Sequence, residues 1–252
     1  MPRFLNSEMF KTAFLLAFAS ALACVFASQA HASRQPCALA LALAIDVSGS
    51  VDQSEYGLQM SGLAAALRSE EVASALAAVG GGKVYVSAMH WSGTGQQAEI
   101  APWTMFDSRE SVLQFADQLE SRPRSFDKFS TAIGEALVFA DAQFAKLNVR
   151  CRRQVIDVSG DGRSNEGWSP NLIRDHVVSR GVTINALAIL ANDKQLKGYF
   201  QRYIIGGAGS FVMSADRFVD YPEAIKRKLV REILPPLAAG HPRVPESQTV
   251  LR

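Results

Sequence analysis

Short apolar segments alternate with segments of helical periodicity along most of this chain. Such alternation predicts a mostly parallel sheet with helices on both faces, because the crossover between two parallel strands usually passes through a helix. The clearest strand is residues 38–45 (ALALALAI), which are apolar throughout and end at Asp46. A short run without polar positions is typical of a strand that is buried on both faces. The sequence therefore predicts a doubly wound α/β fold.

The same pattern gives the order of elements along the chain. The expected strands are residues 38–45, 83–91, 98–103, 154–159, 182–190 and 211–215. Pro102 predicts an edge position for the third of them, since proline cannot donate a hydrogen bond to a neighbouring strand. The expected helices are 54–68, 69–79, 108–119, 131–144, 170–181, 193–203 and 219–234.

Composition narrows the class of protein. The 252 residues suffice for one α/β domain or at most two small ones, and 48% are apolar. A net charge of +2, from 26 basic and 24 acidic residues, supplies no strong field for nucleic acid. Three cysteines and four histidines are too few for a zinc-finger or iron–sulfur protein. After residue 35 no apolar run is long enough to span a membrane, which takes roughly 18–20 residues.

The first 32 residues have the composition of a secretory signal peptide. Basic residues precede the apolar segment 12–27, and Ala30-His31-Ala32 supplies small residues for cleavage. We therefore expect export to the periplasm or beyond. The alternatives are a retained membrane anchor and lipid attachment at Cys24, although a lipid-attachment motif has leucine three positions before the cysteine, where this chain has Ala21. Cleavage after Ala32 leaves two cysteines, an even number that suggests a disulfide in an exported protein.

Oxygen-bearing side chains collect where the expected strands end. Asp46, Ser48 and Ser50 alternate in the loop after the first strand, Thr131 opens a helix, and Asp161 follows the strand 154–159. In parallel sheets, ligands bind at the carboxyl ends of the strands, so these side chains are expected to converge. Two carboxylates and three hydroxyls, without histidine or thiol, suit a hard divalent cation such as Mg²⁺ or Mn²⁺. Mg²⁺ retains several waters, which leaves a position for an outside oxygen.

These residues resemble a known family. Asp-x-Ser-x-Ser at 46–50, Thr-x-x-Gly-x-Ala-Leu at 131–137 and Asp161-Gly162, in this order, are similar to the von Willebrand factor type A (vWA) domain. The resemblance covers roughly residues 38–234, with domain limits of 33–237 and a mobile tail at 238–252. It implies a six-stranded sheet of order 3-2-1-4-5-6 and a metal-ion-dependent adhesion site (MIDAS). It also implies a protein partner that presents an Asp or Glu side chain to the ion.

The implied strand order pairs the two remaining cysteines. Cys37 lies nine residues before Asp46, and Cys151 lies ten before Asp161. If both aspartates mark carboxyl ends of neighbouring parallel strands, about 4.8 Å apart, both cysteines mark the amino ends. The resulting Cα separation would suit a disulfide. We therefore predict a Cys37–Cys151 bond on the side opposite the metal.

Several residues near the site have competing interpretations. Ile-Asp-Val-Ser-Gly occurs at both 45–49 and 156–160, so Asp157 competes with Asp161; we favour a buried carboxylate bonded to a neighbouring helix or loop. Ser48 and Ser50 could merely be turn residues, and Asp52 is expected to cap a helix. His90 and His176 are expected to be ordinary residues. Trp91 and Trp168 either anchor a partner or cover the sheet edge. Arg122, Arg124 and Lys128 form either a solvated loop or a collar for an acidic group.

We expect a binding domain and not an enzyme. Gly80-Gly81-Gly82-Lys83 lacks the serine or threonine of a phosphate-binding loop, and the glycines at 206–209 follow a helix instead of a strand. No Gly-x-Ser-x-Gly occurs, and no histidine lies in the expected site to act as a base. Two alternatives stay open. One is a Mg²⁺-dependent hydrolase or phosphatase with Asp46 as nucleophile, and the other is a periplasmic binder that needs no metal.

Overall fold

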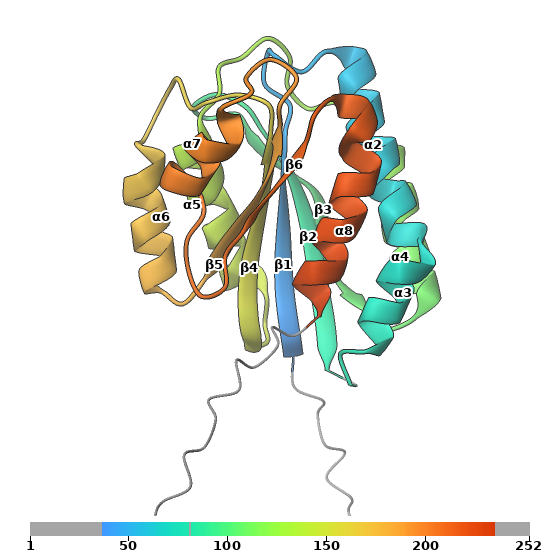
Figure 1. Cartoon of the computed structure of the whole chain (residues 1–252). Coiled ribbons are helices and arrows are strands. Elements are labelled where there is room, and N and C mark those ends of the chain that lie inside the picture. Colours follow the sequence, from blue (N-terminus) through green and yellow to red (C-terminus); the bar gives the residue numbers. More distant parts are fainter. Residues whose placement is uncertain (1–36, 81, 235–252) are drawn as a thin grey trace, which may run out of the picture. The chain divides into compact units, whose positions relative to one another are not determined.

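The computed structural model describes residues 37–80 and 82–234, in which one sheet lies between two layers of helices (Figure 1). The six strands have the order β3-β2-β1-β4-β5-β6, as predicted. Only β2 and β3 pair antiparallel. The strands are β1 (Cys37–Asp46), β2 (Lys83–Trp91), β3 (Gln97–Phe106), β4 (Cys151–Gly160), β5 (Thr183–Ile189) and β6 (Val212–Ala215).

Helices cover both faces of this sheet, which confirms the doubly wound prediction. On one face lie α2 (Gln53–Arg68), α3 (Glu70–Ala77), α4 (Arg109–Glu120) and α8 (Tyr221–Ile233). On the other lie α5 (Ile133–Gln143), α6 (Pro170–Ser179) and α7 (Leu196–Tyr203). Two short 3-10 turns, η1 (Phe144–Lys146) and η2 (Phe218–Asp220), follow α5 and precede α8.

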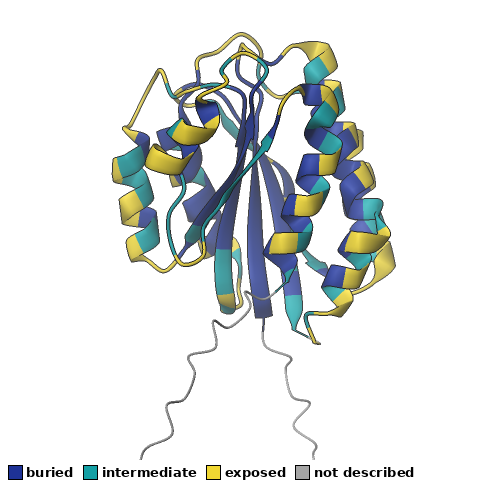
Figure 2. Ribbon diagram, in the orientation of Figure 1, coloured by how far each residue is buried: buried dark blue, intermediate teal, exposed yellow. Residues whose placement is uncertain are grey.

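Strand β1 lies between two hydrophobic cores, with its leucines on one face and its alanines on the other. Leu39, Leu41 and Leu43 pack with α2, α4 and α8, whereas the alanines between them face α5. Successive side chains of a strand point to opposite faces, so one apolar run serves both layers. Every residue of β1 is buried (Figure 2). Each fully buried leucine contributes about 1.5–3 kcal/mol to folding.

The helices begin at the polar residues that the sequence indicated. Asp52 caps α2, where its carboxylate accepts a hydrogen bond of 2.8 Å from the backbone N–H of Glu55. Ser69 caps α3 and Ser108 caps α4, while Pro170 occupies the first turn of α6. Asp52 is therefore a capping residue, as predicted.

Two elements differ from the expectation. Helix α5 begins at Ile133 and not at Thr131, because the backbone of Thr131 pairs with Asn165 instead of joining the helix. Strand β3 runs from Gln97 to Phe106, longer than the predicted 98–103. It lies at the sheet edge, and its register shifts between its pairings to Val86 and Ala88, beside Pro102. Proline is tolerated at such an edge irregularity.

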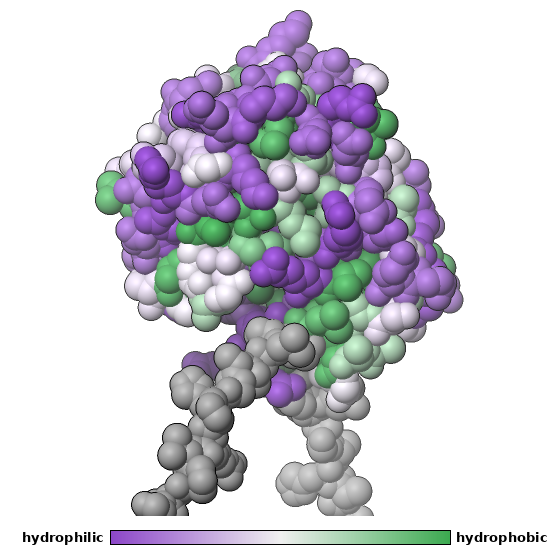
Figure 3. Space-filling view, viewed as in Figure 1, coloured by the Kyte–Doolittle hydropathy of each residue, from purple (hydrophilic) through white to green (hydrophobic). Residues whose placement is uncertain are grey.

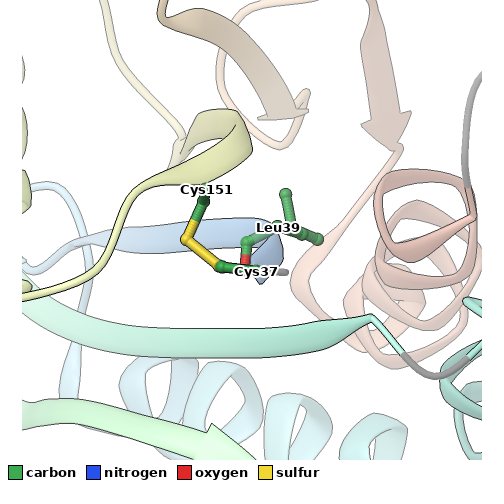
Figure 4. Close-up of a disulfide and its surroundings, with 3 residues drawn as sticks. All are labelled: Cys37, Leu39 and Cys151. Atoms are coloured by element: carbon green, nitrogen blue, oxygen red, sulfur yellow. A yellow bond between two sulfur atoms is a disulfide. The ribbon is translucent and has the colours of Figure 1, made fainter. Parts of the chain in front are cut away.

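The predicted disulfide joins Cys37 and Cys151 (Figure 4). The two cysteines are register partners at the amino ends of β1 and β4, with Cα atoms 4.3 Å apart. Because β1 ends at Asp46, the disulfide lies at the opposite edge of the sheet from the predicted metal ligands.

The predicted signal peptide (1–32) and C-terminal tail (238–252) lie outside the described residues, as do the outer limits of the predicted domain. In the part of the chain that the structure describes, no helix has both the length and the apolar character needed to cross a bilayer.

Candidate metal centre

The five predicted ligands come together at the carboxyl edge of the sheet, the upper edge in Figure 1. Asp46 is the last residue of β1, and Asp161 directly follows β4. Ser48 and Ser50 lie in the loop between β1 and α2, and Thr131 lies two residues before α5. Four of the five are almost completely buried, whereas Ser50 is exposed. Three separate segments thus supply one cluster.

A continuous set of hydrogen bonds connects these side chains. The Ser48 backbone N–H donates to Asp46 Oδ1 over 2.7 Å, and Thr131 Oγ1 donates to Ser48 Oγ over 3.2 Å. The hydroxyls of Ser48 and Ser50 are 3.3 Å apart. Ser50 Oγ donates to Asp161 Oδ1 over 2.6 Å. Each of the five side chains is therefore within hydrogen-bonding distance of another of the five residues, through a side chain or, for Asp46, through the Ser48 backbone.

Each aspartate keeps one buried oxygen without a partner. Among the described residues, neither Asp46 Oδ2 nor Asp161 Oδ2 has a hydrogen-bond partner. Burial, and then the negative charge of Asp161, raises the pKa of Asp46 to about 7. Burial also raises the pKa of Asp161. A cation at this position would offset both the cost of burying two charged carboxylates and the repulsion between them.

The donor set fits a hard divalent cation. It has carboxylate and hydroxyl oxygens only, which are the donors that Mg²⁺ and Mn²⁺ prefer. Within residues 37–80 and 82–234, no three His, Cys, Asp or Glu side chains form a metal cluster. The cluster described here contains only two such side chains, and its remaining oxygens are hydroxyls.

Three residues support the site in ways that the sequence did not predict. Arg124 donates to the carbonyl oxygens of Val47 and Ser48, both over 2.8 Å, and so holds the loop after β1. Asn165 Oδ1 accepts from the Thr131 backbone N–H over 2.9 Å. Gly160 packs so closely that a Cβ there would lie 2.8 Å from Asp46 Oδ2. For Gly160, the Ser-Gly-Asp-Gly sequence at 159–162 was a usable signal.

The three basic residues before Thr131 differ in their contacts. Arg122 donates to the carbonyl oxygen of Ile100, and Arg124 to the loop carbonyls described above. Both guanidinium groups are thus committed to backbone oxygens beside the site. Lys128 is exposed, with a φ of 61° in the left-handed region.

Three other residues that the sequence placed near the site are buried and lie outside the metal cluster. Asp157 Oδ1 forms a buried ion pair with Lys228 Nζ of α8 at 2.5 Å, so it is the buried, helix-bonded carboxylate that we favoured. His90 is fully buried, with Nδ1 2.9 Å from Ser125 Oγ, and burial lowers its pKa to about 3. Trp91 is the last residue of β2 and is also fully buried, so it covers the sheet and reaches no partner.

Trp168 is 65% exposed on the loop before α6. Its backbone N–H donates to Glu135 Oε1 over 3.0 Å, and a Cβ on Gly134 would lie 2.3 Å from its carbonyl oxygen. These contacts fix the backbone that carries the exposed indole. A hollow of about 530 Å³ lies beside it, and two residues of its wall, Ser164 and Asn165, hydrogen-bond to Thr131. The hollow therefore extends from the exposed indole to residues that hold the Thr131 backbone.

Comparisons with known proteins support the fold. The family model described as "Protein of unknown function (DUF1194)" matches residues 36–237. None of the curated proteins compared with the sequence matches it.

Several solved structures are similar at low sequence identity. Proximal thread matrix protein 1 from the mussel byssus, "with zinc occupied MIDAS motif", has 15% identity and a TM-score of 0.53, over 78% of this chain and 46% of that one. A von Willebrand factor type A protein from Catenulispora acidiphila has 13% identity and a TM-score of 0.52, over 78% and 43%. Manganese-loaded TRAP protein of Plasmodium vivax has 16% identity and a TM-score of 0.51, over 78% and 73%. The chain spans less than half the length of the first two, and the likeness shows a vWA-like fold.

Proposed function

The chain belongs to the DUF1194 family, and we propose that it is an exported, metal-dependent protein-interaction domain of the vWA type. The observation that carries the proposal is the pair of buried aspartates, each with one unpartnered oxygen, at the two ends of a hydrogen-bonded set that includes three hydroxyl groups and the Ser48 backbone N–H. Two of the similar structures are described as zinc-occupied and manganese-loaded, which supports a metal at this fold position.

The residues that would hold the ion are those of the sequence prediction. They are Asp46, Ser48, Ser50, Thr131 and Asp161, and the ion is Mg²⁺ or Mn²⁺. A bound dication would supply an acidic position that a carboxylate from outside the chain can occupy. The two carboxylates balance the charge of a dication without filling its coordination shell, and an Asp or Glu side chain of a protein partner completes the shell. Exposed Ser50 marks the side from which this carboxylate arrives.

Trp168 gives the partner a second contact. Aromatic side chains dominate many interfaces because they bury a large area at a low entropic cost. The fixed backbone of Trp168 reduces that cost further, since the loop is already ordered against α5. The partner therefore makes two contacts: its carboxylate binds the metal, and an apolar part of its surface packs against the indole of Trp168.

Export is part of the proposal. The segment 1–32 has the pattern of a signal peptide, and the disulfide between Cys37 and Cys151 suits an oxidising compartment such as the periplasm or the cell exterior. A binding role, as opposed to an enzymatic one, is favoured because fully buried His90, with its strongly lowered pKa, is unsuited to act as a base. Phosphatase turnover that is abolished by Asp46→Ala would instead favour the hydrolase alternative.

Calorimetry with Mg²⁺ and Mn²⁺ tests the metal site. We expect one ion to bind the wild-type chain, and Asp46→Ala to abolish or greatly weaken binding. Asp52→Asn is the matched control, because Asp52 is a nearby, exposed carboxylate that only caps α2. Unchanged affinity in Asp46→Ala would contradict the assignment.

Capture of partners from an envelope extract tests the interaction. We expect capture in Mg²⁺ and its loss in EDTA or in Thr131→Ala, while circular dichroism shows a folded chain in both cases. Thr94→Ala is the control, since Thr94 is an exposed threonine on the neighbouring turn. Capture that persists in chelator would count against a metal-bridged contact and favour the metal-independent alternative.

A further inference from the structure

A second cavity lies at the opposite end of the sheet from the metal centre. It has a volume of about 750 Å³ and lies between α8, the amino-terminal parts of β4 and β5, and the segment before β6. Apolar side chains form much of its wall, among them Val155, Phe211, Val230 and Leu234. Small-molecule sites usually enclose roughly 300–1,000 Å³ and are lined mainly by apolar groups. The cavity therefore has the size and lining of a ligand site.

A buried polar cluster reaches the cavity at Glu232. Lys228 Nζ lies 2.6 Å from Glu232 Oε1 and 2.5 Å from Asp157 Oδ1, and Asn185 Nδ2 donates to Glu232 Oε1 over 2.9 Å. In the described part of the chain, Glu232 Oε2 has no partner, although Glu232 is only 2% exposed. Buried polar atoms are normally paired, so the unpaired Oε2 makes this cluster an unusual feature beside the cavity.

Glu232 adds little negative charge to the cavity. Burial, and then the negative charge of Asp157, raises the pKa of Glu232, and Lys228 Nζ lies 2.6 Å from its Oε1.

Three arginines make the cavity positive. Arg153 donates to the carbonyl oxygens of Glu232 and Ile233 over 2.9 and 2.8 Å, and the Arg231 guanidinium lies 3.7 Å from the centre of the Phe211 ring. Arg227 is the third, and Glu232 is the only acidic residue of the described lining. Figure 3 shows this face, where apolar and strongly hydrophilic side chains adjoin near the lower end of α8.

We propose that this cavity binds a free organic anion with one carboxylate and an apolar chain, of the fatty-acid type. The chain lies against Val155, Phe211 and Val230, and the carboxylate pairs with the guanidinium group of Arg231. Guanidinium–carboxylate pairs are strong because both groups are charged and match in geometry.

Charge complementarity favours this occupant over the chain's own residues 235–252. That segment continues from Leu234, which lines the cavity, but it contains two arginines against one glutamate. Side chains with no net negative charge do not complement a cavity with three arginines in its wall. The fatty-acid type of ligand supplies both the negative charge and the apolar surface.

Calorimetric titration of the full chain with decanoate and with decan-1-ol, in EDTA at neutral pH, tests the proposal. We expect decanoate to bind about tenfold more tightly than the alcohol, the usual order for one charge-assisted contact. Arg231→Ala should weaken decanoate binding about tenfold, whereas Arg217→Ala, at an exposed arginine outside the cavity, should leave it unchanged. Because EDTA removes divalent ions, the result does not depend on the metal centre.

Three outcomes would overturn the proposal. Failure of decanoate to bind is the result expected if residues 235–252 fill the cavity. Equal affinity for the alcohol would mean apolar burial without recognition of an anion. Unchanged affinity in Arg231→Ala would show that decanoate binds at another part of the chain.

Discussion

At the scale of single residues, Asp46 carries the highest electrostatic cost of the metal centre. It is fully buried, and its Oδ1 is stabilised by one backbone N–H. Its pKa is raised to about 7 by burial and by the charge of Asp161. Without a cation, the ionised form of Asp46 therefore destabilises the folded chain. The same residue is the one whose charge a bound dication needs.

Asp46→Asn separates these two effects. An unfolded aspartate has a pKa near 3.8, so between that value and about 7 the folded state retains a proton that the unfolded state releases. Asp46 thus contributes stability at acid pH that is lost as the pH rises through 7. In EDTA we expect the free energy of unfolding of the wild type to fall relative to Asp46→Asn over this range, by at most about 4 kcal/mol.

Urea unfolding at several pH values measures this difference. In Mg²⁺ the order should reverse, because only the wild type gains stability from the ion. Asp52→Asn is again the control and should follow the wild type in both buffers. If Asp46→Asn and the wild type lost stability in parallel with pH, Asp46 would not be the strained group.

At the scale of elements, the sequence predicted what depends on local pattern. The apolar run 38–45 defined β1, and the caps Asp52, Ser69 and Ser108 defined three helix starts. The five candidate ligands were predictable because each lies at a strand end or just before a helix. Strand order and the disulfide came from the resemblance to the vWA family together with the spacing of the cysteines.

Contacts between distant segments could not be predicted from that pattern. Helix α5 starts late because Asn165 binds the Thr131 backbone, and no local signal connects these two residues. Arg124 looked like part of a charged surface, but its side chain turns inward to hold Val47 and Ser48. Trp91 could have anchored a partner, but its side chain is buried in the core at the end of β2. In each case the contact depends on how distant segments pack together in the folded chain, which the local sequence does not indicate.

At the scale of the whole molecule, the carboxyl and amino ends of the parallel strands, which form two edges of the sheet, carry different features. The carboxyl edge gathers the candidate metal ligands, and the amino edge carries the disulfide and borders the arginine-lined cavity. Strands β1 and β4 connect the edges, and ten residues of strand separate them by about 30 Å. This distance predicts that the disulfide contributes to stability without contributing to metal binding.

The double variant Cys37→Ala/Cys151→Ala tests that separation. The bond joins residues 114 apart in sequence, and for such a loop the chain-entropy model predicts a stabilisation of at most about 4–5 kcal/mol. Urea unfolding of the variant in EDTA should show a loss of this order, and dithiothreitol should reproduce it in the wild type. Mg²⁺ affinity at a temperature where the variant is folded should stay within about twofold, because no side chain of the metal centre contacts the disulfide edge. A tenfold loss of affinity would mean that tension along β1 and β4 couples the two edges.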